Sequence, residues 1–170
     1  MVRAFISIGS NINPSANVES ALRTLAKKVH ITAVSTVYAS KAEGRPGQPD
    51  FYNCVAEIET DLNPTDLKYN VLRPIEAELG RRRTPDKYAP RTIDLDLILY
   101  GNLVLNTQEL VLPDPEIPHR PFIALPLAAL DSGLIIPGIN MPISQIAAVS
   151  QEEQIRPLTS YTEYLRHTIR

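Results

Sequence analysis

The chain has 170 residues, of which 44% are hydrophobic and 21% charged, and its formal net charge at pH 7 is −2. These values are typical of one globular domain and give no overall electrostatic attraction to nucleic acid or anionic lipid. The single cysteine, Cys54, excludes a disulfide framework, and three scattered histidines make a Cys/His zinc cluster hard to build.

The first third of the chain alternates between strand and helix signals. Residues 2–11 are apolar, end in a Gly-Ser-Asn turn signal and predict a short strand. The stretch 13–29 predicts a helix, because its apolar residues recur at helical spacing and Asn13 or Ser15 can cap it. Residues 30–40 are rich in β-branched side chains, which predicts a second strand.

The middle of the chain repeats this alternation after a loop rich in Gly and Pro at 41–50. Residues 51–60 predict a strand and 62–81 a second helix, with Asn63 as its cap and Pro64 at the first helical position. Pro74 lies inside that helix, and we expect it to bend or loosen the helix there. A basic loop follows, and then one more strand over 91–101.

The resulting order, β-α-β-β-α-β, is that of the ferredoxin-like split βαβ fold. We therefore expect an α+β protein with a four-stranded antiparallel sheet and both helices on one face. C-terminal elements, namely a strand or hairpin near 102–111 and short helices, would cover the other face. The Pro-rich stretch 111–126 excludes one long helix, and we expect it to run extended over the surface.

Two aspartates interrupt the apolar strand 91–101. Residues i and i+2 of a strand point to the same face, so Asp94 and Asp96 should project side by side while Leu95 and Leu97 face the core. Two close carboxylates repel each other and need a cation, for which arginine and a hard divalent metal such as Mg²⁺ are the common solutions. A solvated strand face with a nearby salt bridge is the alternative.

Basic residues around the aspartates favour nucleotide chemistry. Arg91 enters the strand, and the loop 81–90 before it carries Arg81, Arg82, Arg83 and Lys87. Magnesium carboxylates facing guanidinium groups suit a triphosphate, because the metal bridges phosphate oxygens and arginine neutralises moving charge. The chain has no Walker or GxGxxG phosphate loop, so side chains and metal would have to bind the phosphates. RNA binding by the sheet fits poorly with the acidic charge balance and 6% aromatic residues.

The stretch KYAPRTIDLDLI, residues 87–98, resembles the signature of the 6-hydroxymethyl-7,8-dihydropterin pyrophosphokinase family of folate biosynthesis. Four other stretches resemble that family in the same order: SIGSN, GQPDFYNCVAEIET, IEAELGR and LVLPDPEIPHRPFIALPLAAL. The similarity spans about residues 1–137. It implies a ferredoxin-like fold and transfer of the terminal diphosphate of ATP to the hydroxymethyl group of a reduced pterin, releasing AMP.

The resemblance also implies a role for individual residues. Two Mg²⁺ ions would be held by Asp94 and Asp96. Phosphate contacts and lid closure over ATP would come from the catalytic residues Arg81, Arg83 and Arg91. The residues implied to bind the nucleotide are Arg81, Arg91, Arg120, Tyr88 and Glu76, although Glu76 also fits an exposed helical glutamate. The loop 81–90 would be the lid.

The pterin requires a flat slot and an edge of hydrogen-bonding groups. By resemblance, Phe51 and Phe122 would stack on the ring, and Asn53 and Ser40 would bind its edge. Without the resemblance, core packing would be the preferred interpretation of the two phenylalanines.

The chain departs from the family pattern at three places. Asp114 stands where relatives commonly have a histidine that contacts the nucleotide, and His119, five residues on, is a candidate substitute. The loop after Ser40 is unusual, and the tail from Ser150 has no counterpart. A diverged, non-catalytic module that binds a nucleotide or pterin is therefore the alternative function. Within the tail, 160–169 predicts a short amphipathic helix that packs on the domain or on another subunit.

We expect a single domain over 1–170, with a core of about 1–137 and a C-terminal extension of about 138–170. No segment reaches the ~18 consecutive apolar residues of a membrane span, and the start lacks the apolar length of a secretory signal. The expected location is cytoplasmic and the expected partners are the small molecules ATP and hydroxymethyl dihydropterin, with no nucleic acid or membrane. The sequence leaves the oligomeric state open.

Overall fold

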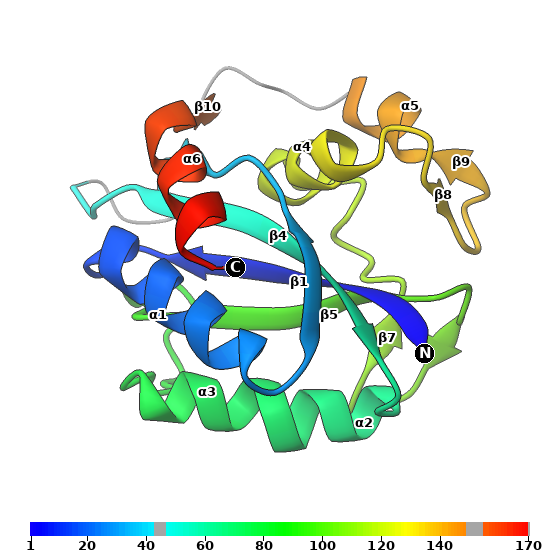
Figure 1. The fold of residues 1–170 in the computed structure, drawn as a ribbon, viewed down its shortest axis with the longest axis horizontal. Helices are drawn as coiled ribbons and strands as arrows, with labels where there is room; N and C mark the ends of the chain where they lie inside the picture. The colour runs from blue at the N-terminus through cyan, green and yellow to red at the C-terminus, as the bar shows by residue number, and fades with distance from the viewer. Residues whose placement is uncertain (43–46, 149–154, 170) are drawn as a thin grey trace.

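The computed structural model describes residues 1–42, 47–148 and 155–169 (Figure 1). The first half contains β1 (Val2–Ser10), α1 (Pro14–Ala26), β2 (His30–Val34), β3 (Tyr38–Ser40), β4 (Phe51–Thr60), α2 (Pro64–Asp66), the π-helical turn η1 (Leu67–Leu72), α3 (Arg73–Glu78) and β5 (Asp94–Tyr100). The second half contains β6 (Leu105–Asn106), β7 (Val111–Leu112), α4 (Pro121–Leu130), β8 (Ile135–Ile136), β9 (Met141–Pro142), α5 (Ile143–Ala148), β10 (Ile155–Pro157) and α6 (Thr159–Thr168).

The main sheet is antiparallel and has the order β10-β3-β4-β1-β5, with β2 also paired to β4. The ferredoxin-like α+β architecture expected from the sequence is confirmed. The expected count of four strands is wrong, because the stretch 30–40 divides into β2 and β3 and the C-terminal β10 adds another strand. The division falls at residues 35–37, where Ser35 is fully buried and its hydroxyl accepts a hydrogen bond from the Val55 amide.

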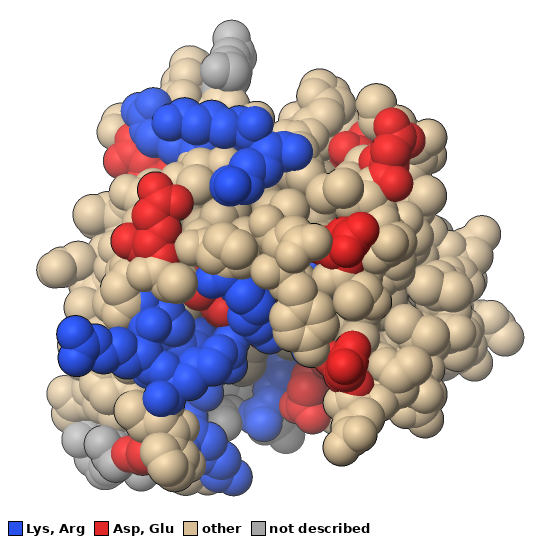
Figure 2. Space-filling view, turned by 90° about the horizontal axis from the view of Figure 1, so that it is seen from below, with Lys and Arg blue, Asp and Glu red and all other residues tan. Residues whose placement is uncertain are grey.

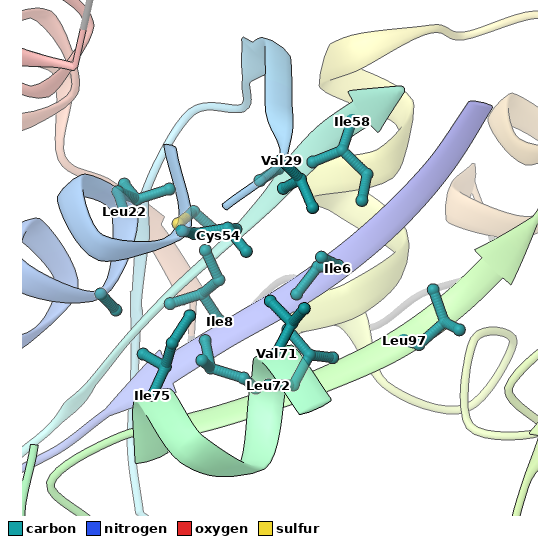
Figure 3. Close-up of a cluster of buried hydrophobic side chains, with 14 of the residues drawn as sticks. Ile6, Ile8, Leu22, Val29, Cys54, Ile58, Val71, Leu72, Ile75 and Leu97 are labelled. Atoms are coloured by element: carbon teal, nitrogen blue, oxygen red, sulfur yellow. The ribbon is translucent and has the colours of Figure 1, made fainter. Parts of the chain in front are cut away.

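Helices cover both faces of the sheet (Figure 1). The helices α1 and α2–α3 lie on one face, and α4 and α5 lie on the other. Figure 3 shows the larger core, in which Ile6 and Ile8 of β1 meet Leu22 of α1 and Ile75 of α3. The second core packs Phe5 and Val55 against Leu127 of α4. The sheet is therefore buried on both sides, and its open ends remain for a site.

The second helix is broken into three consecutive segments. Asn63 caps it as expected, because its side-chain oxygen accepts a hydrogen bond from the Asp66 amide at 2.8 Å. A wider π turn follows, in which the Arg73 amide donates to the Lys68 carbonyl five residues back. This wider turn directly precedes Pro74, which has no amide to donate and would clash with a carbonyl in a regular helix. The loosening predicted at Pro74 thus takes the form of η1.

Two details differ from the sequence-based expectation. Asn13 precedes α1 in a left-handed conformation, with φ of 40°, and makes no side-chain cap bond. The stretch 111–126 is not simply extended, because α4 begins at Pro121 and contains Pro126. Burial of Ile123, Ala124 and Leu127 against the sheet favours the helix, and Pro121 lies where a helix tolerates proline.

The amphipathic helix predicted at the C-terminus is present as α6, and its Leu165 is fully buried in the larger core. Of the two arrangements left open by the sequence, α6 takes the one that packs on the domain itself. No helix within the described ranges is both long enough and apolar enough to traverse a lipid bilayer.

Candidate functional site

A cavity of about 360 Å³ opens at the end of the sheet where β1 and β3 end and β4 and β5 begin. Its volume is within the usual range for small-molecule sites. The residues predicted from the sequence that line it are Ser40, Phe51, Asn53, Tyr88, Arg91, Asp94, Asp96, Arg120 and Phe122. Residues proposed separately for pterin, metal and nucleotide therefore meet in one cavity. Arg81, Arg83 and Glu76 are not among its lining residues.

The acid pair stands at the start of β5 as the alternation predicts. Leu95 is fully buried and Leu97 is 4% exposed, whereas Asp94 and Asp96 both face the cavity. Asp94 accepts hydrogen bonds from Arg81 at 3.0 Å and from Arg91 at 2.9 Å. The alternative interpretation, a carboxylate in a salt bridge, thus applies to Asp94.

Asp96 is held much less tightly than Asp94. Within the described residues its nearest cation is Arg73, at 3.9 Å. Desolvation, together with the negative charge of Asp94, raises the pKa of Asp96 to about 7. Desolvation also raises the pKa of Asp114, against the opposing effect of its hydrogen bond from the Glu116 amide. The site therefore has an excess of carboxylate charge that a cation would relieve.

The donor set fits a hard divalent cation that is shared with a phosphate. No cluster of three or more His, Cys, Asp or Glu side chains with metal-binding geometry occurs in the part of the chain that the structure describes. A metal held by Asp94 and Asp96 would thus complete its coordination with phosphate oxygens and water. Mg²⁺ binds in this way, through one or two carboxylates together with substrate phosphates.

Basic side chains surround these acids. Figure 2 shows Lys and Arg side chains gathered on one face of the molecule, with acidic side chains between and beside them. Lys41, Lys87, Arg91 and Arg120 line the cavity. Arg120 is also ion-paired with Glu116 at 2.8 Å and lies 6.0 Å from the Phe122 ring centre. These cations complement the phosphates of a nucleotide.

Glu76 does not fit the direct nucleotide contact that the resemblance implied. It is 2% exposed, and its carboxylate accepts hydrogen bonds from Arg73 at 2.7 Å, Arg83 at 2.9 Å and the Leu95 amide at 3.0 Å. Arg81 also pairs with it at 3.4 Å. Glu76 is a buried anchor that fixes three arginines and β5, because a buried carboxylate needs such partners. Neither an exposed helical glutamate nor a ligand contact describes it.

The opposite wall of the cavity has the groups predicted for a flat heterocycle. The Asn53 amide nitrogen donates to the Ser40 hydroxyl at 2.8 Å, which fixes the orientation of that amide. Gly9 lies beside it, and a Cβ there would be only 2.9 Å from the Asn53 side-chain oxygen. Phe51 of β4 and Phe122 of α4 come from different elements and both line the cavity.

Two polar residues with no role assigned from the sequence connect the loops around the cavity. Asn11 is 1% exposed and exchanges hydrogen bonds with the Arg91 backbone, accepting from its amide at 2.7 Å. Gln48 accepts from Asn11 at 3.0 Å and donates to the Tyr88 carbonyl at 2.8 Å. Both residues lie in stretches that resemble the family, SIGSN and GQPDFYNCVAEIET, and this resemblance was the one sequence signal that could have identified them.

A second hollow of about 240 Å³ adjoins the first, and Asp96 and Asp114 line both. Lys68 of η1 and Arg73 of α3 contribute positive charge to it. The sequence did not point to either residue, because their position beside this hollow depends on how η1 packs against β5. His119, considered as a substitute for the missing histidine, is not among the described residues lining either hollow.

Comparison with known proteins identifies relatives over most of the chain. Residues 5–132 match the model of the family 7,8-dihydro-6-hydroxymethylpterin-pyrophosphokinase (HPPK). The chain is 34% identical to the 2-amino-4-hydroxy-6-hydroxymethyldihydropteridine pyrophosphokinase of Haemophilus influenzae over 159 residues, covering 92% of this chain and 98% of the relative. The Synechocystis enzyme of the same name is 36% identical over 146 residues, covering 84% of this chain and 73% of the relative.

Longer proteins contain a similar region. The folic acid synthesis protein fol1 of Pneumocystis carinii is 33% identical over 92% of this chain, which spans 21% of that protein. A crystal structure of Plasmodium falciparum HPPK-DHPS superposes with a TM-score of 0.70 at 16% identity, covering 86% of this chain and 45% of the other. At that identity the superposition supports the fold alone.

Proposed function

The chain belongs to the HPPK family, and we propose that the cavity at the end of the sheet is the site where it carries out the family reaction. The chain is a 2-amino-4-hydroxy-6-hydroxymethyldihydropteridine pyrophosphokinase of folate biosynthesis. In this reaction the hydroxymethyl oxygen of the pterin attacks the β-phosphorus of ATP and loses its proton. The bond between the β-phosphorus and the oxygen bridging to the α-phosphate breaks, and AMP leaves with that oxygen.

One observation carries the assignment of the site. Asn53 on β4 and Asp94 on β5 are both register partners of Gly9, so the pterin-type wall and the acid pair flank the same residue of β1. A pterin bound by Phe51, Phe122, Asn53 and Ser40 would therefore lie next to a triphosphate bound at Asp94 and Asp96. Such proximity is the main requirement for in-line phosphoryl transfer.

We place the triphosphate across the boundary of the two hollows, since Asp96 and Asp114 line both. The adenosine would occupy the smaller hollow and the pterin the larger one. Asp94 and Asp96 would hold two Mg²⁺ ions, which would supply positive charge against the charge that develops on the phosphates. Arg91 and Arg120 would contact the phosphates directly, and Arg81 and Arg83 would act from the rim, where Glu76 and Asp94 hold them.

The loop 81–90 is proposed as the lid that excludes water during transfer. It carries Arg81, Arg83 and Tyr88, and the side chains of Lys87 and Tyr88 line the cavity. The loop makes few buried contacts, since most of its residues are exposed. That exposure is typical of segments that move over a bound substrate.

We also propose that the whole chain is one pyrophosphokinase domain that works in the cytoplasm. Leu165 of the C-terminal helix belongs to the same core cluster as Ile6 of β1, which supports a single cooperative unit. The one cysteine, Cys54, is a buried free thiol, as is usual in reducing compartments.

The acid pair provides the test of this site. We expect Asp94→Ala and Asp96→Ala each to lower turnover by about 100-fold or more, because the charge of the triphosphate would be left without its metal. Formation of AMP from ATP is measured with and without the pterin, and circular dichroism checks the fold. Asp61→Ala, at a side chain 81% exposed, serves as the matched control. Near-native turnover in either site variant would overturn the metal role, and AMP that forms equally well without pterin would overturn the transfer reaction.

A further inference from the structure

The C-terminal segment 155–169 lies beyond the residues matched by the family model, which end at 132. It is not a loose extension. β10 pairs with β3, placing Ile155 opposite Ser40 and Pro157 opposite Tyr38. Without β10, the short strand β3 would be the edge of the sheet on this side. The segment therefore completes the sheet next to Ser40, which lines the proposed pterin cavity.

The same segment satisfies the backbone of the bend that joins β2 to β3. The Val37 amide donates to the Thr162 hydroxyl at 2.9 Å, and the Val37 carbonyl accepts from the Leu158 amide at 2.7 Å. Arg166 donates to the Val34 carbonyl at 3.1 Å. Val37 is fully buried, so leaving its backbone amide and carbonyl without these partners would destabilise the fold.

Two further contacts reach the start of β4. The Tyr161 ring lies 5.5 Å from the Tyr52 ring, and Tyr52 stands between the proposed pterin residues Phe51 and Asn53. Arg156 pairs with Asp50 at 3.2 Å, directly before Phe51. The segment thus contacts both strands that carry proposed pterin residues, β3 with Ser40 and β4 with Phe51 and Asn53. We call these three residues the pterin wall.

The sheet order separates this contact from the phosphate side of the site. β10 and β3 lie at one edge of the order β10-β3-β4-β1-β5, whereas the acid pair is on β5 at the other edge. A change in the C-terminal segment should therefore move the pterin wall while leaving the acid pair and its arginines in place. This separation makes the effect selective for one substrate.

We propose that residues 155–169 position the pterin wall, with Thr162 as the positioning residue at its centre, so that this segment sets the affinity for the pterin and not for ATP. The inference rests on the proposed function of the cavity. Loosening the bend at Val37 would reduce the fraction of molecules in which Ser40, Phe51 and Asn53 are correctly placed. The apparent affinity for pterin falls in proportion to that fraction.

Three single variants of the full chain test the proposal. Thr162→Val keeps the shape of the side chain but removes the acceptor of the Val37 amide, and Thr162→Ser restores that acceptor. Thr168→Val is the matched control, because the Thr168 hydroxyl, like that of Thr162, donates to the carbonyl four residues back but has no recorded bond to Val37. The constants kcat and KM are measured for ATP and for 6-hydroxymethyl-7,8-dihydropterin, each with the other substrate saturating and with Mg²⁺ present.

We expect Thr162→Val to raise the KM for pterin about fivefold or more while the KM for ATP and kcat stay within about twofold. Thr162→Ser and Thr168→Val should match the wild type. An unchanged pterin KM in Thr162→Val, or an equal rise in both KM values, would overturn the positioning role. A wild-type protein without turnover would instead contradict the proposed function, so the two failures are distinguishable.

A fourth variant keeps the proposal testable if Thr162→Val does not fold. Arg156→Gln removes the ion pair with Asp50 at a side chain that is 66% exposed, so the fold should tolerate it. We expect a smaller rise in the pterin KM, about threefold, with the ATP KM within about twofold of the wild type, because exposed ion pairs contribute at most about 1 kcal/mol. A rise confined to ATP, or no change in pterin KM, would count against the proposal.

Discussion

Gly9 is the residue at which the two halves of the site meet. It pairs with Asn53 on one side and with Asp94 on the other. There is no space for a side chain at Gly9, because an added Cβ would lie 2.9 Å from the Asn53 side-chain oxygen and 3.9 Å from the Phe51 ring. The absence of a side chain at Gly9 thus leaves room for the Asn53 side-chain amide beside β1.

Replacing Gly9 by alanine should therefore weaken pterin binding selectively. The added methyl group would push the Asn53 amide out of its bond with Ser40, and we expect the pterin KM to rise about tenfold, equivalent to about 1.4 kcal/mol. The ATP KM should change little. Gly133→Ala is the control, because the nearest atom to its Cβ would be 3.8 Å away. Steady-state kinetics of both variants give the answer, and an unchanged pterin KM in Gly9→Ala would show that Asn53 does not bind the pterin.

Glu76 acts on stability as well as on the arginines. Glu76→Ala would leave the buried Leu95 amide and the poorly exposed Arg81 without their carboxylate partner. Removing one member of a buried ion-pair network is strongly destabilising, and we expect a loss of about 3 kcal/mol in the free energy of unfolding.

Urea denaturation measures this effect, and Glu78→Ala is the control, at an exposed position on the same helix. A loss below about 1 kcal/mol in Glu76→Ala would place Glu76 among ordinary surface ion pairs, contrary to its burial.

At the scale of elements, two loops around the cavity are joined by one side chain. Gln48 connects the 47–50 loop to Asn11 through one hydrogen bond and to Tyr88 in the loop 81–90 through another. Neither loop has a regular strand or helix of its own. The resting position of the proposed lid therefore depends on side-chain hydrogen bonds.

Gln48→Leu should release the loop 81–90 without unfolding the protein. Loss of a hydrogen bond of about 1 kcal/mol increases the open population about fivefold. Hydrogen exchange followed by mass spectrometry should show faster exchange of amides in 84–90, with no change in β1 or β4. Gln145→Leu, at an exposed position on α5, is the matched control. Equal protection of 84–90 in wild type and Gln48→Leu would contradict the tether.

At the scale of the whole molecule, the site combines acidic and basic groups that neutralise each other only partly. Asp94 is paired with Arg81 and Arg91, whereas Asp96 has no partner nearer than Arg73 at 3.9 Å among the described residues. Metal and nucleotide should therefore bind together, because the triphosphate can pair with the arginines while the carboxylates bind the metal.

This coupling predicts a stabilisation that requires the metal. A non-hydrolysable ATP analogue at 100 times its dissociation constant, with Mg²⁺, should add about 2.7 kcal/mol to the free energy of unfolding. Chelating the metal with EDTA should remove most of this gain, which a thermal unfolding experiment records. Asp96→Asn should behave like the chelated wild type. Full stabilisation by the analogue in EDTA would mean that the nucleotide binds without the acid pair.

The sequence by itself determined the features that depend on neighbours along the chain. The alternation of Asp94 and Asp96 with Leu95 and Leu97 fixed which side chains leave the core, because side-chain direction in a strand has a period of two. The cap at Asn63 and the disturbance at Pro74 also followed from local chemistry. The family motifs then identified most of the predicted site residues that line the cavity, but not the outlying positions of Arg81, Arg83 and Glu76.

Only the tertiary structure decided how distant segments share a site. The anchoring role of Glu76 comes from β5 and the loop after α3, and the helix α4 in the Pro-rich stretch depends on burial against the sheet. The split between β2 and β3 likewise depends on partners in β4 and α6. Such contacts join residues far apart in the chain, 125 positions for Val37 and Thr162, and local periodicity carries no information about them.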